Sequence, residues 1–298
     1  MIEQYLSQDL VLELEKCYAS GYRKDELEEI RIRVGQPVEW VFSTGIIRGE
    51  KSIREWDVAE VMNYLTDYSW YAFSDEIRRG YFTIKGGNRV GVSGRTGCVG
   101  DRVENISDVG MINIRVAHQK IGCASEIMEC IRNEDRIFNT LFVSLPGRGK
   151  TTYLRDCIRI LSSGLDGKLG LKVGVVDERS EIGASYNGIP QNDLGKRTDI
   201  LDDCPKQHGM RMLLRSMSPD IIAVDELSDK KDFEALEDII ASGINIIGTI
   251  HGNSVEDVRK KISKFQIGNK IDRYIYIDID ESGKRKLLVY GRKGEIIA

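Results

Sequence analysis

The stretch T-L-F-V-S-L-P-G-R-G-K-T-T, residues 140 to 152, decides the fold class of this chain. It opens with a short apolar run of the kind that forms a buried strand. It leads into a segment in which Leu154, Ile158 and Leu161 recur at helical spacing. Between them, two glycines allow backbone N–H groups to point inward around phosphate oxygens. The order of strand, glycine loop and helix therefore predicts a phosphate-binding loop.

The residues of this loop have predicted parts in holding a nucleotide. The helix that begins near Lys150 adds its positive end, the Lys150 side chain can reach the β- and γ-phosphates, and the Thr151 hydroxyl can hold Mg²⁺. Ser144 stands where the pattern G-x-x-x-x-G-K-[ST] has its first glycine, which reduces backbone freedom there. The residues predicted to bind ATP are Pro146, Gly147, Arg148, Gly149, Lys150, Thr151 and Thr152.

An acidic pair, Asp225 and Glu226, directly follows the apolar run 221–224. Carboxylates at the C-terminal end of a buried parallel strand face the crevice where open α/β sheets bind ligands. Asp225 is therefore the predicted partner of Thr151 in binding Mg²⁺, and Glu226 is the residue predicted to polarise the attacking water. The alternative is an acidic pair that only caps the next helix.

Two other apolar strands are followed by polar groups of the same kind. The run 173–176 leads into an acidic cluster that contains Glu178, and the run 244–250 ends at His251. If these strand ends converge on one metal–phosphate site, Glu178 can assist Glu226, and His251 can sense the γ-phosphate by hydrogen bonding. Surface ion pairing is the alternative for the acidic cluster, and a structural role is the alternative for the histidine.

The apolar pattern changes along the chain. From Thr140 onward, short apolar strands alternate with helix-period segments, which indicates a parallel sheet covered on both faces. Before it, short strand-like runs separated by glycine-rich turns indicate an antiparallel sheet, with a hairpin around Gly35 and Pro37. The sequence thus predicts an α/β P-loop core over residues 136–298, preceded by a smaller α+β domain over residues 1–135.

Composition excludes several classes of protein. Of the 298 residues, 41% are hydrophobic and 30% are charged, which is typical of a soluble globular chain. The formal net charge of −4 leaves no overall basic excess for nucleic acid or an anionic membrane. No apolar run approaches the ~18 residues of a membrane span, and the amino terminus lacks the pattern of a secretory signal. The six cysteines form no C-x-x-C pair and are expected to be reduced, buried thiols of a cytoplasmic protein.

Four elements in this order resemble the type II secretion and type IV pilus ATPases. In that family, Lys150-Thr151, Asp177-Glu178, L-R-S-M-S-P-D-I-I-A-V-D-E and T-I-H-G-N correspond to the phosphate loop, the Asp box, the acidic strand and the His box. Three blocks are more similar still to the sporulation stage III AA family. They are V-G-V-V-D-E-R-S-E-I (173–182), G-I-P-Q-N-D-L-G-K-R-T-D-I-L-D-D-C-P-K (188–206) and G-M-R-M-L-L-R-S-M-S-P-D-I-I-A-V-D-E (209–226).

This resemblance implies a RecA-like core that assembles as a homo-hexameric ring with ATP at the subunit interfaces. It implies a cytoplasmic place in the mother cell, peripheral to the membrane around the forespore, where the ring would energise a secretion-like channel. The docking partner would be a membrane protein of the same sporulation complex. It further implies an arginine supplied from an N-terminal domain, with Arg115 as the candidate and Arg95 behind it. A solvated strand residue is the alternative for either arginine.

We therefore expect a Mg²⁺-dependent ATP hydrolase that acts as a motor in endospore formation. A nucleic-acid-dependent ATPase is a second interpretation, which the acidic charge balance disfavours. An ATP-binding scaffold without turnover is a third, which the presence of Lys150, Thr151, Asp225 and Glu226 disfavours. A P-loop small-molecule kinase is a weaker fourth, because His251 has no role there.

Overall fold

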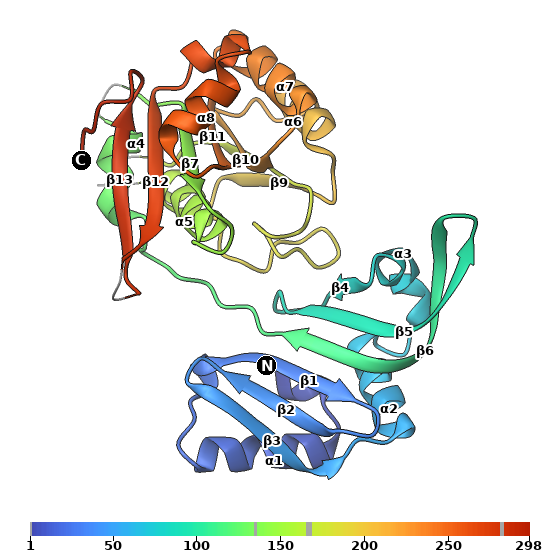
Figure 1. The fold of residues 1–298 in the computed structure, drawn as a ribbon. Helices are drawn as coiled ribbons and strands as arrows, with labels where there is room; N and C mark the ends of the chain where they lie inside the picture. The colour runs from blue at the N-terminus through green and yellow to red at the C-terminus, as the bar shows by residue number, and fades with distance from the viewer. Residues whose placement is uncertain (1, 134–135, 165–168, 281–282) are drawn as a thin grey trace. The chain divides into compact units, whose positions relative to one another are not determined.

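The structure is a computed structural model that describes residues 2–133, 136–164, 169–280 and 283–298. The chain divides into two compact units, Met1–His118 and Gln119–Ala298 (Figure 1). This division falls earlier than the predicted boundary after residue 135. Residues 134 and 135 themselves lie outside the described part of the chain. Segment 119–133 belongs to the second unit because apolar side chains there, among them Ile127 and Ile131, join that unit's core.

A buried carboxylate also ties this segment to the second unit. Asp156, on helix α5 (Lys150–Ser163), is only 1% exposed. It accepts hydrogen bonds from the backbone N–H groups of Gly122 (3.0 Å) and Ala124 (2.8 Å) and from Arg159 (2.8 Å). Burial acts to raise the pKa of Asp156, but these hydrogen bonds outweigh it and hold the pKa below its ordinary value. The ionised Asp156 carboxylate therefore joins the backbone at Gly122 and Ala124 to α5.

The first unit is an antiparallel sheet with helices, as predicted. Its six strands are ordered β3-β2-β1-β6-β5-β4, and every neighbouring pair is antiparallel. The strands are β1 (Leu27–Arg33), β2 (Pro37–Phe42), β3 (Gly45–Ser52), β4 (Tyr81–Thr83), β5 (Arg89–Val99) and β6 (Arg102–Arg115). The helices are α1 (Gln8–Ala19), α2 (Glu55–Leu65) and α3 (Ser74–Arg78), with 3₁₀ turns η1 (Ile2–Tyr5), η2 (Lys24–Glu26) and η3 (Trp70–Phe73).

The predicted hairpin is formed by β1 and β2, whose turn contains Gly35 at a φ of 79°. Strands β5 and β6 are longer than their apolar runs suggested. Their outer parts are largely exposed and polar, so the sequence there lacks the alternation of apolar and polar residues that predicts a strand.

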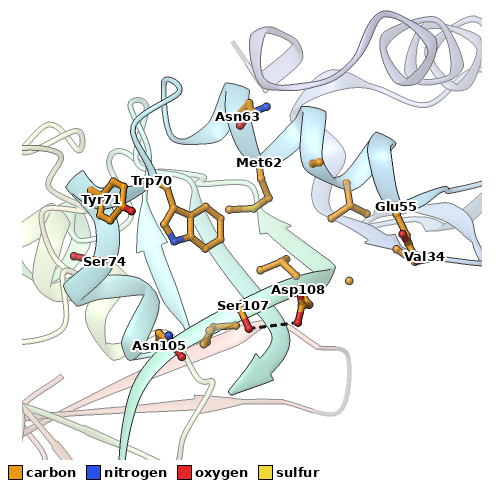
Figure 2. A pocket seen from close by; sticks show the side chains of 15 residues that line it. Val34, Glu55, Met62, Asn63, Trp70, Tyr71, Ser74, Asn105, Ser107 and Asp108 are labelled. Carbon is orange, nitrogen blue, oxygen red and sulfur yellow. Dashed lines mark hydrogen bonds between the residues drawn. The ribbon is translucent and has the colours of Figure 1, made fainter. Parts of the chain in front are cut away.

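A pocket of about 1080 Å³ opens in the first unit, lined by residues of α2, η3 and β6. Figure 2 shows the indole of Trp70 pointing into it, near Met62. Its charged lining residues are Glu55 and Asp108. This pocket contains none of the residues predicted to bind nucleotide, all of which lie in the second unit.

The second unit is built on a mixed sheet ordered β13-β12-β7-β11-β10-β8-β9. Neighbours from β12 to β9 are all parallel, as predicted, and only β13 runs antiparallel at one edge. The strands are β7 (Thr140–Ser144), β8 (Val173–Asp177), β9 (Thr198–Asp202), β10 (Ile221–Leu227), β11 (Asn245–His251), β12 (Arg273–Ile279) and β13 (Arg285–Gly291).

Helices cover both faces of this sheet (Figure 1). Side chains alternate along β7, so Phe142 packs with α5, whereas Leu141 and Val143 pack with α6, α7 and α8 on the opposite face. The other helical elements are α4 (Met128–Ile131), α6 (Lys206–Ser216), α7 (Lys230–Ala241), α8 (Val255–Ile262), η4 (Ser125–Ile127) and η5 (Gln266–Asn269). Across the described residues, no helix combines the length and the apolar character that crossing a membrane requires.

The strand order determines which residues meet at the C-terminal edge. Strand β11 lies between β7 and β10, with His251 in register with Ser144 and Ile250 with Leu227. The ends of these three strands therefore bring the phosphate loop, the histidine and the acidic pair side by side, although long stretches of chain separate them.

Replacing Asp156 with alanine should destabilise the protein strongly. The change leaves the buried N–H of Ala124, the partly buried N–H of Gly122 and the Arg159 guanidinium without their shared acceptor, which costs about 2–4 kcal/mol of the free energy of unfolding. Urea unfolding of the full chain measures this loss.

The matched control is Asp238→Ala. Asp238 is an exposed carboxylate on α7 that pairs with Arg211 at 2.9 Å. Such a surface pair contributes about 0–1 kcal/mol. Equal losses in the two variants would contradict the role assigned to Asp156.

Candidate active site

The phosphate loop joins the end of β7 to the start of α5. Two glycines turn it, Gly147 at a φ of 75° and Gly149 at 100°, both in the left-handed region that favours glycine. A Cβ on Gly149 would also lie 2.9 Å from Nε of Arg285, which donates a hydrogen bond to the Arg148 carbonyl (3.1 Å). Ser144 is the last residue of β7 and keeps an extended backbone, so this position does not require glycine.

The ammonium group of Lys150 is buried beneath the loop, with the residue 5% exposed. It lies within 3.2 Å of the Ser144 and Leu145 carbonyls, 3.3 Å from the Ser144 hydroxyl and 3.1 Å from Nδ1 of His251. Burial lowers the pKa of Lys150, and the negative charges of Asp225 and Glu226 counteract part of that shift. The four hydrogen-bonding partners of the ammonium group are two carbonyls, a hydroxyl and an imidazole nitrogen, and none of these acceptors carries a negative charge.

These contacts also determine the tautomer of His251. A protonated lysine only donates hydrogen bonds, so Nδ1 of His251 must accept one and carry no proton. Its proton then lies on Nε2, which donates to Oε1 of Glu226 at 3.3 Å. His251 therefore connects the phosphate-loop lysine to the acidic strand.

Asp225 and Thr151 form a pair of oxygen ligands suited to Mg²⁺. The Thr151 hydroxyl donates to Oδ2 of Asp225 at 2.6 Å, and the Thr249 hydroxyl donates to Oδ1. Hard cations prefer such oxygens, and Mg²⁺ usually takes one or two protein ligands together with substrate phosphates. Among the described residues, no group of three or more His, Cys, Asp or Glu could form a larger metal site. The donor set at Thr151 and Asp225 therefore fits Mg²⁺ bound with a nucleotide.

Glu226 is held by its backbone as well as its side chain. Its φ of 52° is uncommon for a non-glycine residue, and the β10–β11 ladder is irregular between Val224 and Leu227. The Glu226 N–H donates to Oγ1 of Thr249 (2.8 Å) and to Oδ1 of Asp225 (3.0 Å). This irregularity directs both carboxylates away from the strand ladder and into the site.

The sequence of this chain matches known proteins over nearly its full length. The family model described as "Sporulation stage III, protein AA" matches residues 2–297. The chain belongs to this family. Stage III sporulation protein AA of Bacillus subtilis (strain 168) is 36% identical over 275 residues, which cover 92% of this chain and 89% of that relative.

Solved structures similar to this family member are secretion and pilus ATPases. The Legionella pneumophila ATPase DotB superimposes with a TM-score of 0.62 at 15% identity, covering 95% of this chain and 80% of that one. The pilus retraction motor PilT, solved with bound ADP, gives a TM-score of 0.65 at 15% identity, covering 93% and 80%. These likenesses confirm the predicted fold, that of the RecA-like secretion ATPases.

The structure brings together five of the predicted site residues of this family member: Lys150, Thr151, Asp225, Glu226 and His251. Pro146, Gly147, Arg148 and Gly149 form the loop above Lys150, and Thr152 lies in the first turn of α5. The roles of these residues in binding and catalysis remain predictions.

Two predicted catalytic residues have other surroundings. Glu178 forms an ion pair with Lys206, a buried residue at the start of α6. Arg115 is an exposed residue at the end of β6 in the first unit, opposite Glu29 and Arg89 in the sheet. Their assignments as catalytic residues therefore remain predictions.

Asp177, the acid that precedes Glu178, anchors its own loop. It is 1% exposed and accepts hydrogen bonds from the backbone N–H groups of Glu181, Ile182 and Gly183 at 2.8–2.9 Å. The pKa of Asp177 is raised to about 6, with burial as the largest cause; the charge of the nearby Asp202 adds to the rise, and these hydrogen bonds oppose it. Asp177 thus fixes the loop after β8, and its contacts do not reach the Thr151–Asp225 pair.

Sequence reasoning missed two residues that bind the acidic pair. Thr249 bridges Asp225 and the Glu226 backbone, and its place two residues before His251 on one strand could have indicated it, because strand residues i and i+2 share a face. Arg179 donates to Oε2 of Glu226 at 2.5 Å. No sequence signal marks it, because its position depends on the fold of the loop after β8.

The elevated pKa of Asp177 predicts a pH-dependent stability. Because the folded-state pKa is raised, the contribution of Asp177 to the free energy of unfolding is complete below about pH 4 and is lost as the pH rises through about 6. Asp177→Asn has no titrating proton at this site. The stability of the wild-type protein relative to this variant should therefore fall by about 2–3 kcal/mol between pH 4 and pH 7.

Urea unfolding of both proteins at each pH, at fixed ionic strength, measures this difference. A difference that stays constant from pH 4 to pH 7 would show that burial does not perturb Asp177.

Proposed function

We propose that this chain is a Mg²⁺-dependent ATP hydrolase that serves as the motor of a secretion-like complex in endospore formation. The observation that carries the proposal is the contact of Lys150, His251, Asp225 and Glu226 at one edge of the second sheet. Membership of the sporulation stage III AA family and the likeness of the fold to secretion ATPases support it.

The surroundings of Lys150 favour a phosphate ligand. Its three N–H donors are shared among four neutral acceptors at 3.1–3.3 Å, whereas charge-assisted hydrogen bonds to anions are about 2.7–2.9 Å long. Among the residues that the structure describes, this buried cation therefore has no anionic partner within hydrogen-bond distance. A phosphate oxygen placed in the loop would supply one, next to the N-terminal end of α5.

In the proposed hydrolysis, each residue around Lys150 would have a separate role. Thr151 and Asp225 would hold Mg²⁺, which when bound neutralises negative charge on the phosphates. Glu226 would accept a hydrogen bond from the attacking water and orient it. Thr249 fixes both acids, because its hydroxyl accepts from the Glu226 N–H and donates to Asp225. His251 would report phosphate binding at Lys150 to Glu226.

The assembly and location that we propose follow from the family. The chain would form a homo-hexameric ring with ATP at its interfaces and an arginine, Arg115, supplied from a neighbouring subunit. The ring would lie in the cytoplasm of the mother cell, peripheral to the membrane around the forespore, and dock on a membrane protein of the same complex. The net charge of −4 gives no reason to expect nucleic acid as a partner.

Hydrolysis of Mg·ATP by the purified full chain, with nucleotide affinity and oligomeric mass measured in parallel, tests the proposal. Lys150→Ala should lose ATP binding. Glu226→Gln should bind ATP but lose turnover by at least about 100-fold, the range of a general base. Arg115→Ala should bind ATP normally and lose turnover only in the assembled ring, by about 10³-fold or more.

Lys231→Ala and Glu256→Gln make the same chemical changes at exposed residues of α7 and α8 and should leave turnover unchanged. Tight ATP binding without turnover in every assembly state would instead support the scaffold alternative. Turnover that depends on DNA or RNA would support a nucleic-acid motor.

A further inference from the structure

Both carboxylate oxygens of Glu226 are occupied in this structure. Oε1 accepts a hydrogen bond from Nε2 of His251 at 3.3 Å, and Oε2 accepts one from Nη1 of Arg179 at 2.5 Å. The second contact is short and charge-assisted, and so it is the stronger of the two. In this arrangement the carboxylate points toward a cation of its own chain, and an incoming water would have to compete with Arg179 for it.

The loop that carries Arg179 is fixed at several points. Asp177 binds the N–H groups of residues 181–183, and the Ser180 hydroxyl donates to Asp202 at 2.8 Å. From α5, Arg155 donates to the carbonyls of Glu181 (2.6 Å) and Ile182 (2.9 Å). These bonds restrict the backbone on both sides of Arg179. The guanidinium is thus presented to Glu226 by an ordered loop, although its side chain is 60% exposed.

The opposite side of Glu226 is connected to the phosphate site. Lys150 donates to Nδ1 of His251, whose Nε2–H donates to Glu226, so the three side chains form one hydrogen-bonded chain. Arg179 ends this chain at its other side. A phosphate that engages Lys150 would withdraw the donor from Nδ1 of His251 and loosen the hold of the histidine on Glu226. The Arg179 contact would then be the remaining restraint on the carboxylate.

We propose that Arg179 is a positioning residue that restrains Glu226 in an unproductive orientation, and that ATP hydrolysis requires this ion pair to open. The inference rests on the proposed function, because it gives Glu226 the task of orienting water. It adds a built-in brake on the basal rate, formed by the loop after β8. Any contact that draws Arg179 away from Glu226 would release this brake.

The test compares the wild-type full chain with Arg179→Ala and Arg179→Lys in steady-state hydrolysis of Mg·ATP. Arg179→Ala should raise kcat about two- to fivefold with little change in KM, which is the range set by an ion pair of this exposure. Arg179→Lys keeps the positive charge and N–H donors, and its kcat should stay close to the wild-type value. A kcat of Arg179→Ala that equals the wild-type value, or falls below it, would overturn the proposal, and a fall would make Arg179 a contributor to the transition state.

Two controls separate this idea from the proposed function. The gain in rate must disappear in Arg179→Ala/Lys150→Ala; hydrolysis that persists there would mean that the activity comes from another site, and the proposed function would fail. If hydrolysis depends on Lys150 but is unaffected by Arg179→Ala, only the brake fails. Arg211→Ala removes an arginine from an exposed ion pair on α6 and should leave kcat unchanged.

A readout without nucleotide tests the ion pair itself. In urea unfolding of the nucleotide-free chain, the midpoint shift of Arg179→Ala/Glu226→Gln should be smaller than the sum of the two single shifts, because each single change already removes the same charge–charge interaction. Additive shifts would mean that Arg179 does not hold Glu226 in the free protein, which would contradict the proposal.

Discussion

The buried ammonium group of Lys150 is the constraint on which the site depends. It lies beneath a glycine loop, and each hydrogen-bonding partner within reach is neutral. Burial of a cation is costly when no anion is hydrogen-bonded to it, and the pKa of Lys150 is lowered although the charges of Asp225 and Glu226 offset part of that cost. We therefore expect this site to accept an anion. The helix that begins at Lys150 and the two glycines with positive φ provide the remaining donors and the space for it.

The order of the strands turns this local feature into a site with several parts. Because β11 lies between β7 and β10, His251 stands between the lysine and the acidic pair and can contact both. Thr249, on the same face of β11, locks Asp225 and the strained backbone of Glu226 together. A change in the hydrogen bonds of Lys150 can thus alter the contact between His251 and Glu226. The loop after β8 approaches Glu226 from the other side through Arg179.

Much of this arrangement could be predicted from the sequence. Apolar strands followed by Gly147 and Gly149, by Asp225 and by His251 predicted the parallel sheet and the convergence of these residues, because strand ends of one parallel sheet share an edge. The first domain was predicted to end at residue 135, whereas the chain divides after His118. Segment 119–133 is bound to the second unit by Asp156, and a carboxylate in the middle of a helix gives no hint of a backbone partner so far away in the sequence.

The contacts of the loop after β8 could not be predicted for a related reason. The sequence D-E-R-S-E offers four charged side chains, and only the folded loop determines which are buried and which are paired. Asp177 accepts hydrogen bonds from backbone N–H groups. Glu178 forms an ion pair with Lys206, and Arg179 forms one with Glu226. Residue type alone would assign any of these acids to a metal. Their neighbours in space, and not their order along the chain, give each its role.

The central claim is that Lys150 exchanges His251 for phosphate when nucleotide binds. Nitrogen NMR of ¹⁵N-histidine-labelled full chain tests it most directly, since the chain has three histidines and His251→Gln identifies the relevant signals. Without nucleotide, His251 should carry its proton on Nε2 and present a hydrogen-bonded, unprotonated Nδ1. A non-hydrolysable ATP analogue with Mg²⁺ should shift the Nδ1 signal of His251 toward that of a free acceptor and leave His118 and His208 unchanged. A proton on Nδ1 in the free protein, or an unchanged His251 signal once the analogue is bound, would contradict the account.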